Sequence, residues 1–198
     1  MLQHLITQDE DLRMVPIDRD ALVAEVARLR EELAGEAGRA DPARTRMLTR
    51  WIGIGLLSLG APGDAQAFFR WSLALAASAH NTKAVVATGL NLGDAHRYAG
   101  DLPAADALYR GALATARSQC QEILDYALQH FGKHLMESGA LADARTHLQE
   151  ALRLRIAKGD IELLASTQAA LDRVASLIAV NEAEAGATAR SEWSRGGQ

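Results

Sequence analysis

Apolar and small residues recur along the chain at intervals typical of paired helices. Three segments contain an apolar residue followed by glycine, at Ile52-Gly53, Leu92-Gly93 and Phe131-Gly132. Counted from that glycine, all three have glycine at offset 7, alanine at offset 12, a large apolar or aromatic side chain at offset 16 and leucine at offset 20. The segments lie 40 and 39 residues apart, so the chain contains an internal repeat.

Capping residues, prolines and glycines predict where the helices begin and end. Asp41 followed by Pro42 is typical of a helix start, and Gly60 is typical of a residue just past a helix end. These signals predict helices at 42–59, 62–79, 82–99, 103–117, 119–138, 142–157 and 160–178. A further helix is expected near 18–35, with Leu22, Val26, Leu29 and Leu33 on one face.

The first glycine of each segment needs an explanation, since glycine inside a helix costs about 1 kcal/mol relative to alanine. Gly93 is expected to face Ala105 across a pair of helices, so that the two axes approach closely. Gly53 with Ala65 and Gly132 with Ala144 would repeat this contact. The glycines therefore indicate close packing rather than a binding loop.

The spacing within each unit resembles that of the tetratricopeptide repeat, in which a small residue follows an apolar one in the first helix and a glycine marks the turn. The resemblance implies an all-α fold, a right-handed solenoid of antiparallel helix pairs. It would contain three repeats at about 42–80, 81–119 and 120–158, an N-terminal helix and a capping helix at 160–178. The solenoid domain would span 16–180, between a mobile arm at 1–15 and a mobile tail at 181–198.

The repeat of 39–40 residues is longer than the usual 34 or so. Elongated repeats of this kind are similar to those of Pins-type scaffold proteins, kinesin light chains and bacterial regulator sensor domains.

The resemblance also implies a concave groove lined by the first helix of each repeat. Transferred to this chain, the groove positions are Arg50, Ile54, Leu57, Leu90, Asp94, Arg97, Tyr98, Gln129, Lys133, Met136 and Glu137, with Met47, Tyr126, Gln168 and Asp172 at its margins. Such a groove is apolar at its N-terminal end and of mixed charge further on. It would suit a helix or an extended peptide with an apolar anchor followed by charges. Alternatively, the N-terminal helix buries the apolar end.

The family's chaperone-tail binders use lysine and asparagine one turn apart on a first helix. The matching positions here are Arg50 with Ile54 and Leu90 with Asp94, and only the neighbouring Asn91 fits that pattern. A chaperone C-terminus is therefore not the expected ligand.

Charge and composition also restrict the classes of partner and the localisation to be expected. The formal net charge of −4 gives no indication of nucleic-acid binding. The acidic N-terminus lacks the pattern of a signal peptide, and continuous apolar runs such as WIGIGLLSLG are shorter than the ~20 residues that span a bilayer. The single cysteine, Cys120, excludes an internal disulfide. We expect a cytoplasmic protein with no nucleic-acid or membrane partner.

Catalytic chemistry is not expected. His130 and His134 lie four residues apart, a spacing that could supply half of a metal site, but HFGKH lacks the glutamate of a zinc peptidase helix. The glycines occur singly and form no phosphate-binding loop. We therefore expect no catalytic residues, no cofactor and no metal, and interpret the histidines as groove or packing residues.

Three functional hypotheses follow. The first is a non-catalytic scaffold or adaptor that binds a protein or peptide partner in the concave groove. The second is a regulatory sensor domain that binds a small molecule or short peptide and controls a partner outside this chain. The third is a structural homodimer formed through the 18–35 helix or an exposed terminal face.

Overall fold

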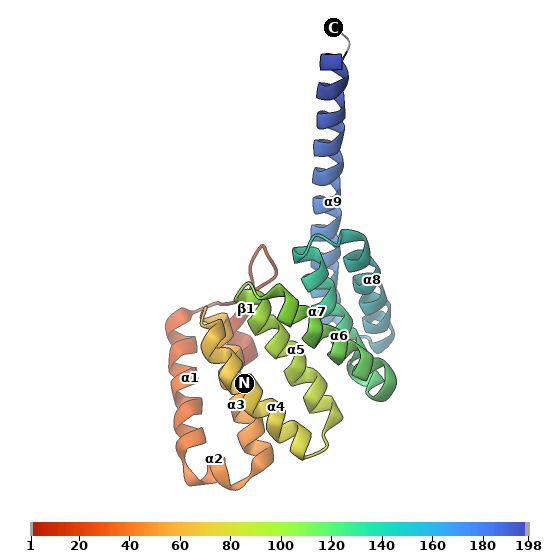
Figure 1. Ribbon diagram of the computed structural model, residues 1–198. Helices are drawn as coiled ribbons and strands as arrows, with labels where there is room; N and C mark the ends of the chain where they lie inside the picture. Colours follow the sequence, from red (N-terminus) through yellow and green to blue (C-terminus); the bar gives the residue numbers. More distant parts are fainter. Residues whose placement is uncertain (1, 197–198) are drawn as a thin grey trace.

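The computed structural model describes the backbone of residues 2–196 and the side chains of 2–36, 38, 40–161 and 163–185. The chain is all-α apart from one small hairpin (Figure 1). The elements are the 3-10 helices η1 (Leu2–Leu5) and η2 (Gln121–Ile123), the strands β1 (Ile6–Gln8) and β2 (Met14–Pro16), and the helices α1 (Arg19–Ala34), α2 (Glu36–Ala40), α3 (Pro42–Ser58), α4 (Pro62–Ser78), α5 (Thr82–Tyr98), α6 (Leu102–Gln119), α7 (Leu124–Glu137), α8 (Leu141–Lys158) and α9 (Ile161–Gly196).

Helices α3–α6 and α8 begin and end within two residues of the predicted positions, because the local signals act as expected. The side chain of Asp41 accepts a hydrogen bond from the Ala43 amide at the start of α3, and Asn81 does the same for Ala84 in α5. Helix α7 begins at Leu124 rather than near 119, since the chain first forms η2.

The second glycine of each repeat ends the first helix. Gly60, Gly100 and Gly139 have φ values of +82°, +81° and +81°, in the left-handed region that glycine adopts without strain. Beyond Gly60, the Ala61 amide donates to the Leu56 carbonyl, the hydrogen bond of a Schellman motif. The identical geometry explains why the offset between the two glycines is constant.

The first glycine of each repeat packs against the second helix. A Cβ atom placed on Gly93 would lie 2.7 Å from Cε1 of the Tyr109 ring, and one on Gly53 would lie 2.6 Å from Cε1 of Phe69. The nearest neighbour of each glycine is therefore the large side chain at offset 16, which lies closer than the predicted alanine at offset 12. At Gly132 that alanine is also close, since the Ala144 carbonyl oxygen lies 3.4 Å from a Cβ position.

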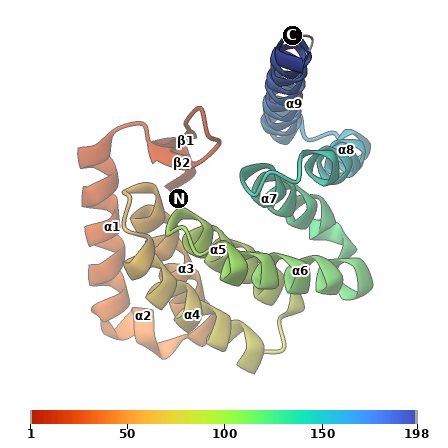
Figure 2. The same cartoon turned by 45° about the horizontal axis from the view of Figure 1, so that its top comes forward.

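Helices α3, α5 and α7 form one layer. Each contacts the next along the chain, and each also packs against the helix that follows it, α4, α6 or α8. Figure 2 shows the N-terminal hairpin beside the layer formed by α3, α5 and α7. This layer is the one to which the sequence assigned the groove.

The N-terminal residues expected to form a mobile arm are built into the fold instead. Strands β1 and β2 pair antiparallel, with Thr7 opposite Val15. Leu2 is fully buried and Leu12 is 7% exposed. The expectation failed because the segment contains enough apolar side chains to bury, although they follow no helical period.

Helix α1 covers the N-terminal end of the helical layer. Leu22, Val26, Leu29 and Leu33 are buried, as their spacing predicts. Gly55 of α3 allows this approach, since a Cβ there would collide with Cγ2 of Val26.

Helix α9 extends far beyond the predicted end at 178 and away from the other helices (Figure 1). The mobile tail predicted from 181 is therefore helical through Gly196. Ala170 and Val174 are fully buried on the side facing the other helices. The stretch Leu163–Ala185 is also long and apolar enough, by length and composition, to cross a membrane. Counting continuous apolar residues does not detect this stretch, because polar residues interrupt it.

Candidate functional site

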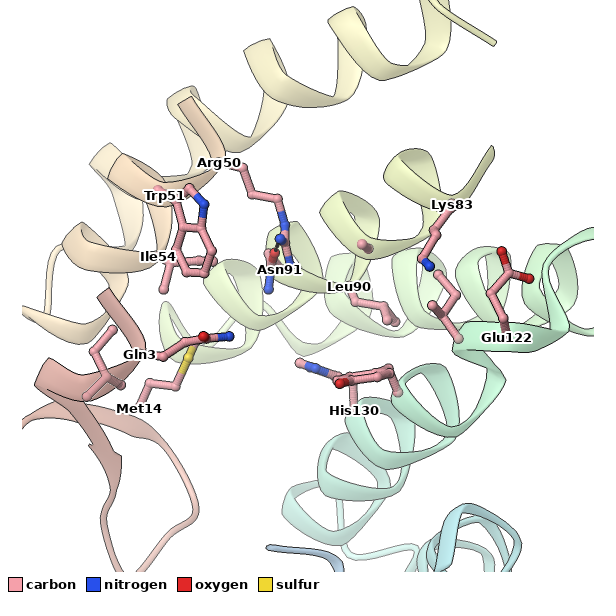
Figure 3. Close-up of a pocket in the computed structure, with 14 residues that line it drawn as sticks. Gln3, Met14, Arg50, Trp51, Ile54, Lys83, Leu90, Asn91, Glu122 and His130 are labelled. Atoms are coloured by element: carbon pink, nitrogen blue, oxygen red, sulfur yellow. Dashed lines mark hydrogen bonds between the residues drawn. The ribbon is translucent and has the colours of Figure 1, made fainter. Parts of the chain in front are cut away.

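A cavity of about 570 Å³ opens between the N-terminal segment and helices α3, α5 and α7. Figure 3 shows side chains from these four parts of the chain pointing toward a common space. The lining residues are Gln3, Ile6, Met14, Arg50, Trp51, Ile54, Lys83, Ala87, Leu90, Asn91, Glu122, Ile123, Tyr126 and His130.

Arg50 is the most distinctive polar group of this cavity. Its Nε donates a hydrogen bond to Oδ1 of Asn91 at 2.8 Å, and its guanidinium lies 5.8 Å from the centroid of the Trp51 ring. No carboxylate among the described side chains forms an ion pair with it. Burial, together with the nearby charge of Arg46, lowers the pKa of Arg50. The cation is thus held in a fixed position without a counter-charge.

The rest of the cavity wall is largely apolar. Ile54 and Leu90 are 7% and 1% exposed and lie on the floor between α3 and α5. Trp51 and Tyr126 add aromatic faces from α3 and α7. A ligand would therefore meet these apolar faces beside Arg50, together with the polar side chains of Gln3, Lys83, Asn91, Glu122 and His130.

The cavity-lining His130 of α7 contacts a buried carboxylate, that of Asp94 in α5. Asp94 is 2% exposed; its Oδ2 lies 2.7 Å from Nδ1 of His130, and its Oδ1 accepts hydrogen bonds from Tyr109 Oη at 2.7 Å and Arg97 Nη2 at 3.2 Å. Burial would raise the pKa of Asp94, but His130, Arg97 and Tyr109 together hold it well below its ordinary value. Asp94 therefore orients the His130 ring and does not itself face the cavity.

Arg97 continues this buried network toward α7. It is 1% exposed, and its Nη1 donates to Oε2 of Glu137 at 3.0 Å. Its guanidinium also lies 5.0 Å from the centroid of the Tyr98 ring. The side chain predicted to meet a ligand carboxylate is thus already paired within the chain.

The N-terminal hairpin covers the residues predicted to form the mixed-charge part of a groove. The Met14 amide donates to Oη of Tyr98 at 2.7 Å, and Lys133 Nζ lies 3.5 Å from the Leu12 carbonyl oxygen. Glu137 forms an ion pair with Arg13 of the hairpin. Tyr98, Lys133 and Glu137 are therefore predicted groove residues that contact this chain's own N-terminal segment.

The remaining predicted residues have other surroundings. Leu57 is 1% exposed and lies in the buried cluster that includes Leu22 and Val26 of α1. This agrees with the alternative prediction that the N-terminal helix buries the apolar end of the groove. Gln129 points toward α9, where its Nε2 lies 3.4 Å from the Ser166 carbonyl oxygen. Met136 is 7% exposed, beside the hairpin residues Asp11 and Arg13.

Of the predicted groove residues, Arg50, Ile54, Leu90 and the marginal Tyr126 line the cavity. Sequence reasoning missed the contribution of Gln3, Ile6 and Met14, because it assigned no structure to the N-terminal segment. The apolar residues Leu2, Leu5, Ile6, Leu12 and Met14, spread through those fifteen positions, are the signal that could have indicated a buried element.

The two histidines of α7 do not form a joint site. His130 faces Asp94, whereas Nε2 of His134 lies 3.5 Å from Oδ1 of Asp106 and its ring lies 5.2 Å from that of Tyr109. Burial lowers the pKa of His134. Within the described part of the chain, no cluster of three histidine, cysteine or acidic side chains could hold a metal ion.

No protein-family model and no curated protein matches this chain. The cavity and the internal repeat are therefore the observations on which a function can be based.

Proposed function

We propose that the protein is a non-catalytic interaction module, an elongated solenoid of the tetratricopeptide-repeat type that binds a partner's protein segment in its concave groove. The helix pairs repeat one geometry at Gly60, Gly100 and Gly139, which supports the repeat interpretation. The adjacent packing of α3, α5 and α7 supports a common concave face.

The observation that supports this function best is Arg50, which has no ion pair among the described side chains and lies beside the apolar faces of Trp51 and Ile54 in the cavity. A partly buried cation without an ion-pair partner carries a desolvation cost, and a ligand carboxylate would offset that cost. Because guanidinium and carboxylate groups form paired hydrogen bonds, the two Nη groups of Arg50 would also fix the orientation of a bound carboxylate. The expected ligand is a segment with an acidic side chain or terminal carboxylate next to apolar or aromatic residues.

The experiment is a selection of random 12-residue peptides displayed on phage against the immobilised full chain, followed by titration of the enriched peptides. We expect Arg50→Met to weaken their binding at least tenfold, about 1.4 kcal/mol. The matched control is Arg145→Met, since Arg145 is exposed on α8, away from the cavity. A thermal melt of each variant checks that the fold is retained.

Equal binding by wild type and Arg50→Met, with both folded, would contradict the proposal. So would a selection that enriches no peptide, or peptides whose binding depends on Arg145.

The sensor hypothesis remains a second candidate, favoured by the size of the cavity. A volume of about 570 Å³ lies within the usual range of small-molecule sites, about 300–1,000 Å³. The same arginine predicts a carboxylic acid with an apolar body as the ligand. A thermal-shift screen of such acids tests it: a rise in melting temperature that Arg50→Met abolishes supports a sensor, and no shift with any acid contradicts it.

A further inference from the structure

The hairpin makes the kinds of contact that a bound peptide makes. Its backbone offers an amide to Tyr98 and a carbonyl to Lys133, an apolar side chain, Leu12, is buried, and Arg13 pairs with Glu137. Main-chain hydrogen bonds combined with pockets for selected side chains are typical of peptide recognition. In addition, the Arg13 guanidinium lies 5.1 Å from the centroid of the Tyr98 ring.

This occupant fits imperfectly. Leu12 adopts φ +60°, a left-handed conformation that is unfavourable for a leucine. Lys133 is 6% exposed, yet within the described part of the chain its ammonium hydrogen-bonds only to the Leu12 carbonyl, at a long 3.5 Å. Nearby, Arg97 Nε and Gln129 Oε1 are buried without hydrogen-bond partners among the described residues. A two-stranded hairpin is also marginal without the surface on which it packs.

The geometry points to Tyr98, Lys133, Met136 and Glu137 as a peptide-recognition surface, occupied here by residues 9–14 as a tethered ligand. The partner would present a leucine followed by an arginine in an extended or turn segment, and would displace the hairpin. The inference rests on the proposed function, since it adds a second, covered part to the same groove. Because the hairpin is on the same chain, its effective concentration is high and free peptides bind only in competition with it.

The test uses a fluorescent synthetic peptide of residues 5–17, LITQDEDLRMVPI, and the full chain. In the double variant Leu12→Ala/Arg13→Glu, called the opened variant, the hairpin loses the buried Leu12 side chain and the guanidinium that pairs with Glu137. We expect the peptide to bind this variant at least tenfold more tightly than wild type. A control peptide with the same two substitutions should bind at least tenfold more weakly than the native peptide. Arg13→Glu alone is a milder variant should the double one fail to fold, and it is expected to change binding in the same direction.

Two hydroxyl deletions separate this surface from the rest of the molecule. In the opened variant, Tyr98→Phe removes the acceptor of the Met14 amide and should weaken the peptide severalfold. Thr146→Val removes one hydroxyl from the exposed side of α8 and should leave its affinity unchanged.

Equal affinity of the peptide for wild type and opened chain, or no effect of Tyr98→Phe, would overturn the inference. If peptides selected through Arg50 still bind in that case, the proposed function stands and only the tethered-ligand inference fails. Loss of their binding as well would overturn both.

Discussion

Gly93 and Gly111 both lie inside helices, but their surroundings are opposite. A Cβ on Gly93 would lie 2.7 Å from the Tyr109 ring, whereas one on Gly111 would meet nothing within 4 Å. Tyr109 cannot easily retreat, since it is fully buried and its hydroxyl donates to Asp94. Only the first glycine therefore has a packing reason to be glycine.

We expect Gly93→Ala to lower the free energy of unfolding by about 1–3 kcal/mol, the usual cost of overpacking a core. Gly111→Ala should raise it by about 0.5–1 kcal/mol, because alanine favours the helix. Urea denaturation of the two variants measures both effects. Shifts of the same sign would contradict the packing described for this helix pair.

The buried Lys133 makes the stability of the fold depend on pH. Burial lowers its pKa from 10.5 to about 8, with Arg97 and Arg155 acting in the same direction and Asp94 and Asp9 opposing. In the unfolded chain the group keeps its proton to about pH 10.4. Between these values the unfolded chain binds more protons, so the contribution of Lys133 to stability rises with pH from about 8 to 10.5.

The variant Lys133→Met removes that contribution. We expect its stability advantage over wild type, of the order of 1–3 kcal/mol below pH 8, to shrink as the pH approaches 10.5. Comparing urea midpoints of the two chains at each pH cancels the titration of other groups. A difference that does not change with pH would show that Lys133 is not perturbed by burial.

At the scale of elements, the paired helices could be predicted and the N-terminal hairpin could not. Asp41, Asn81 and Gly60 act through local hydrogen bonds and backbone preference, which sequence spacing displays directly. The hairpin depends on surfaces more than 80 residues away, such as Tyr98 for Met14. No local pattern encodes that contact, so the sequence could not predict that the hairpin lies over Lys133 while Arg50 lines an open cavity.

Helix α9 joins the helical layers through its first half. Arg155 of α8, 2% exposed, donates to the Leu163 carbonyl at 3.1 Å and contacts Thr167, and Val174 is fully buried. Residues 181–185 are exposed. Ending the chain after 159 should therefore uncover α8 and cause aggregation, whereas ending it after 181 should leave light scattering unchanged. Identical behaviour of the two truncations would contradict the capping role of α9.

For the whole molecule, we propose that partners bind the face formed by α3, α5 and α7. One part of that face is an open cavity around Arg50, and the other is covered by the hairpin, with His130 and Asp94 between them. The helices α4, α6 and α8 have no part in this proposal.

The most direct measurement is a methyl NMR titration of the labelled full chain with a phage-selected peptide whose binding Arg50→Met weakens. Ile54 lines the cavity, and Ile156 on α8 is 60% exposed, so the two isoleucines report on the groove and on the second helices. We predict that the methyl signals of Ile54 and Leu90 shift on binding while those of Ile156 stay in place. Shifts confined to Ile156, with Ile54 and Leu90 unchanged at saturation, would contradict binding in the groove.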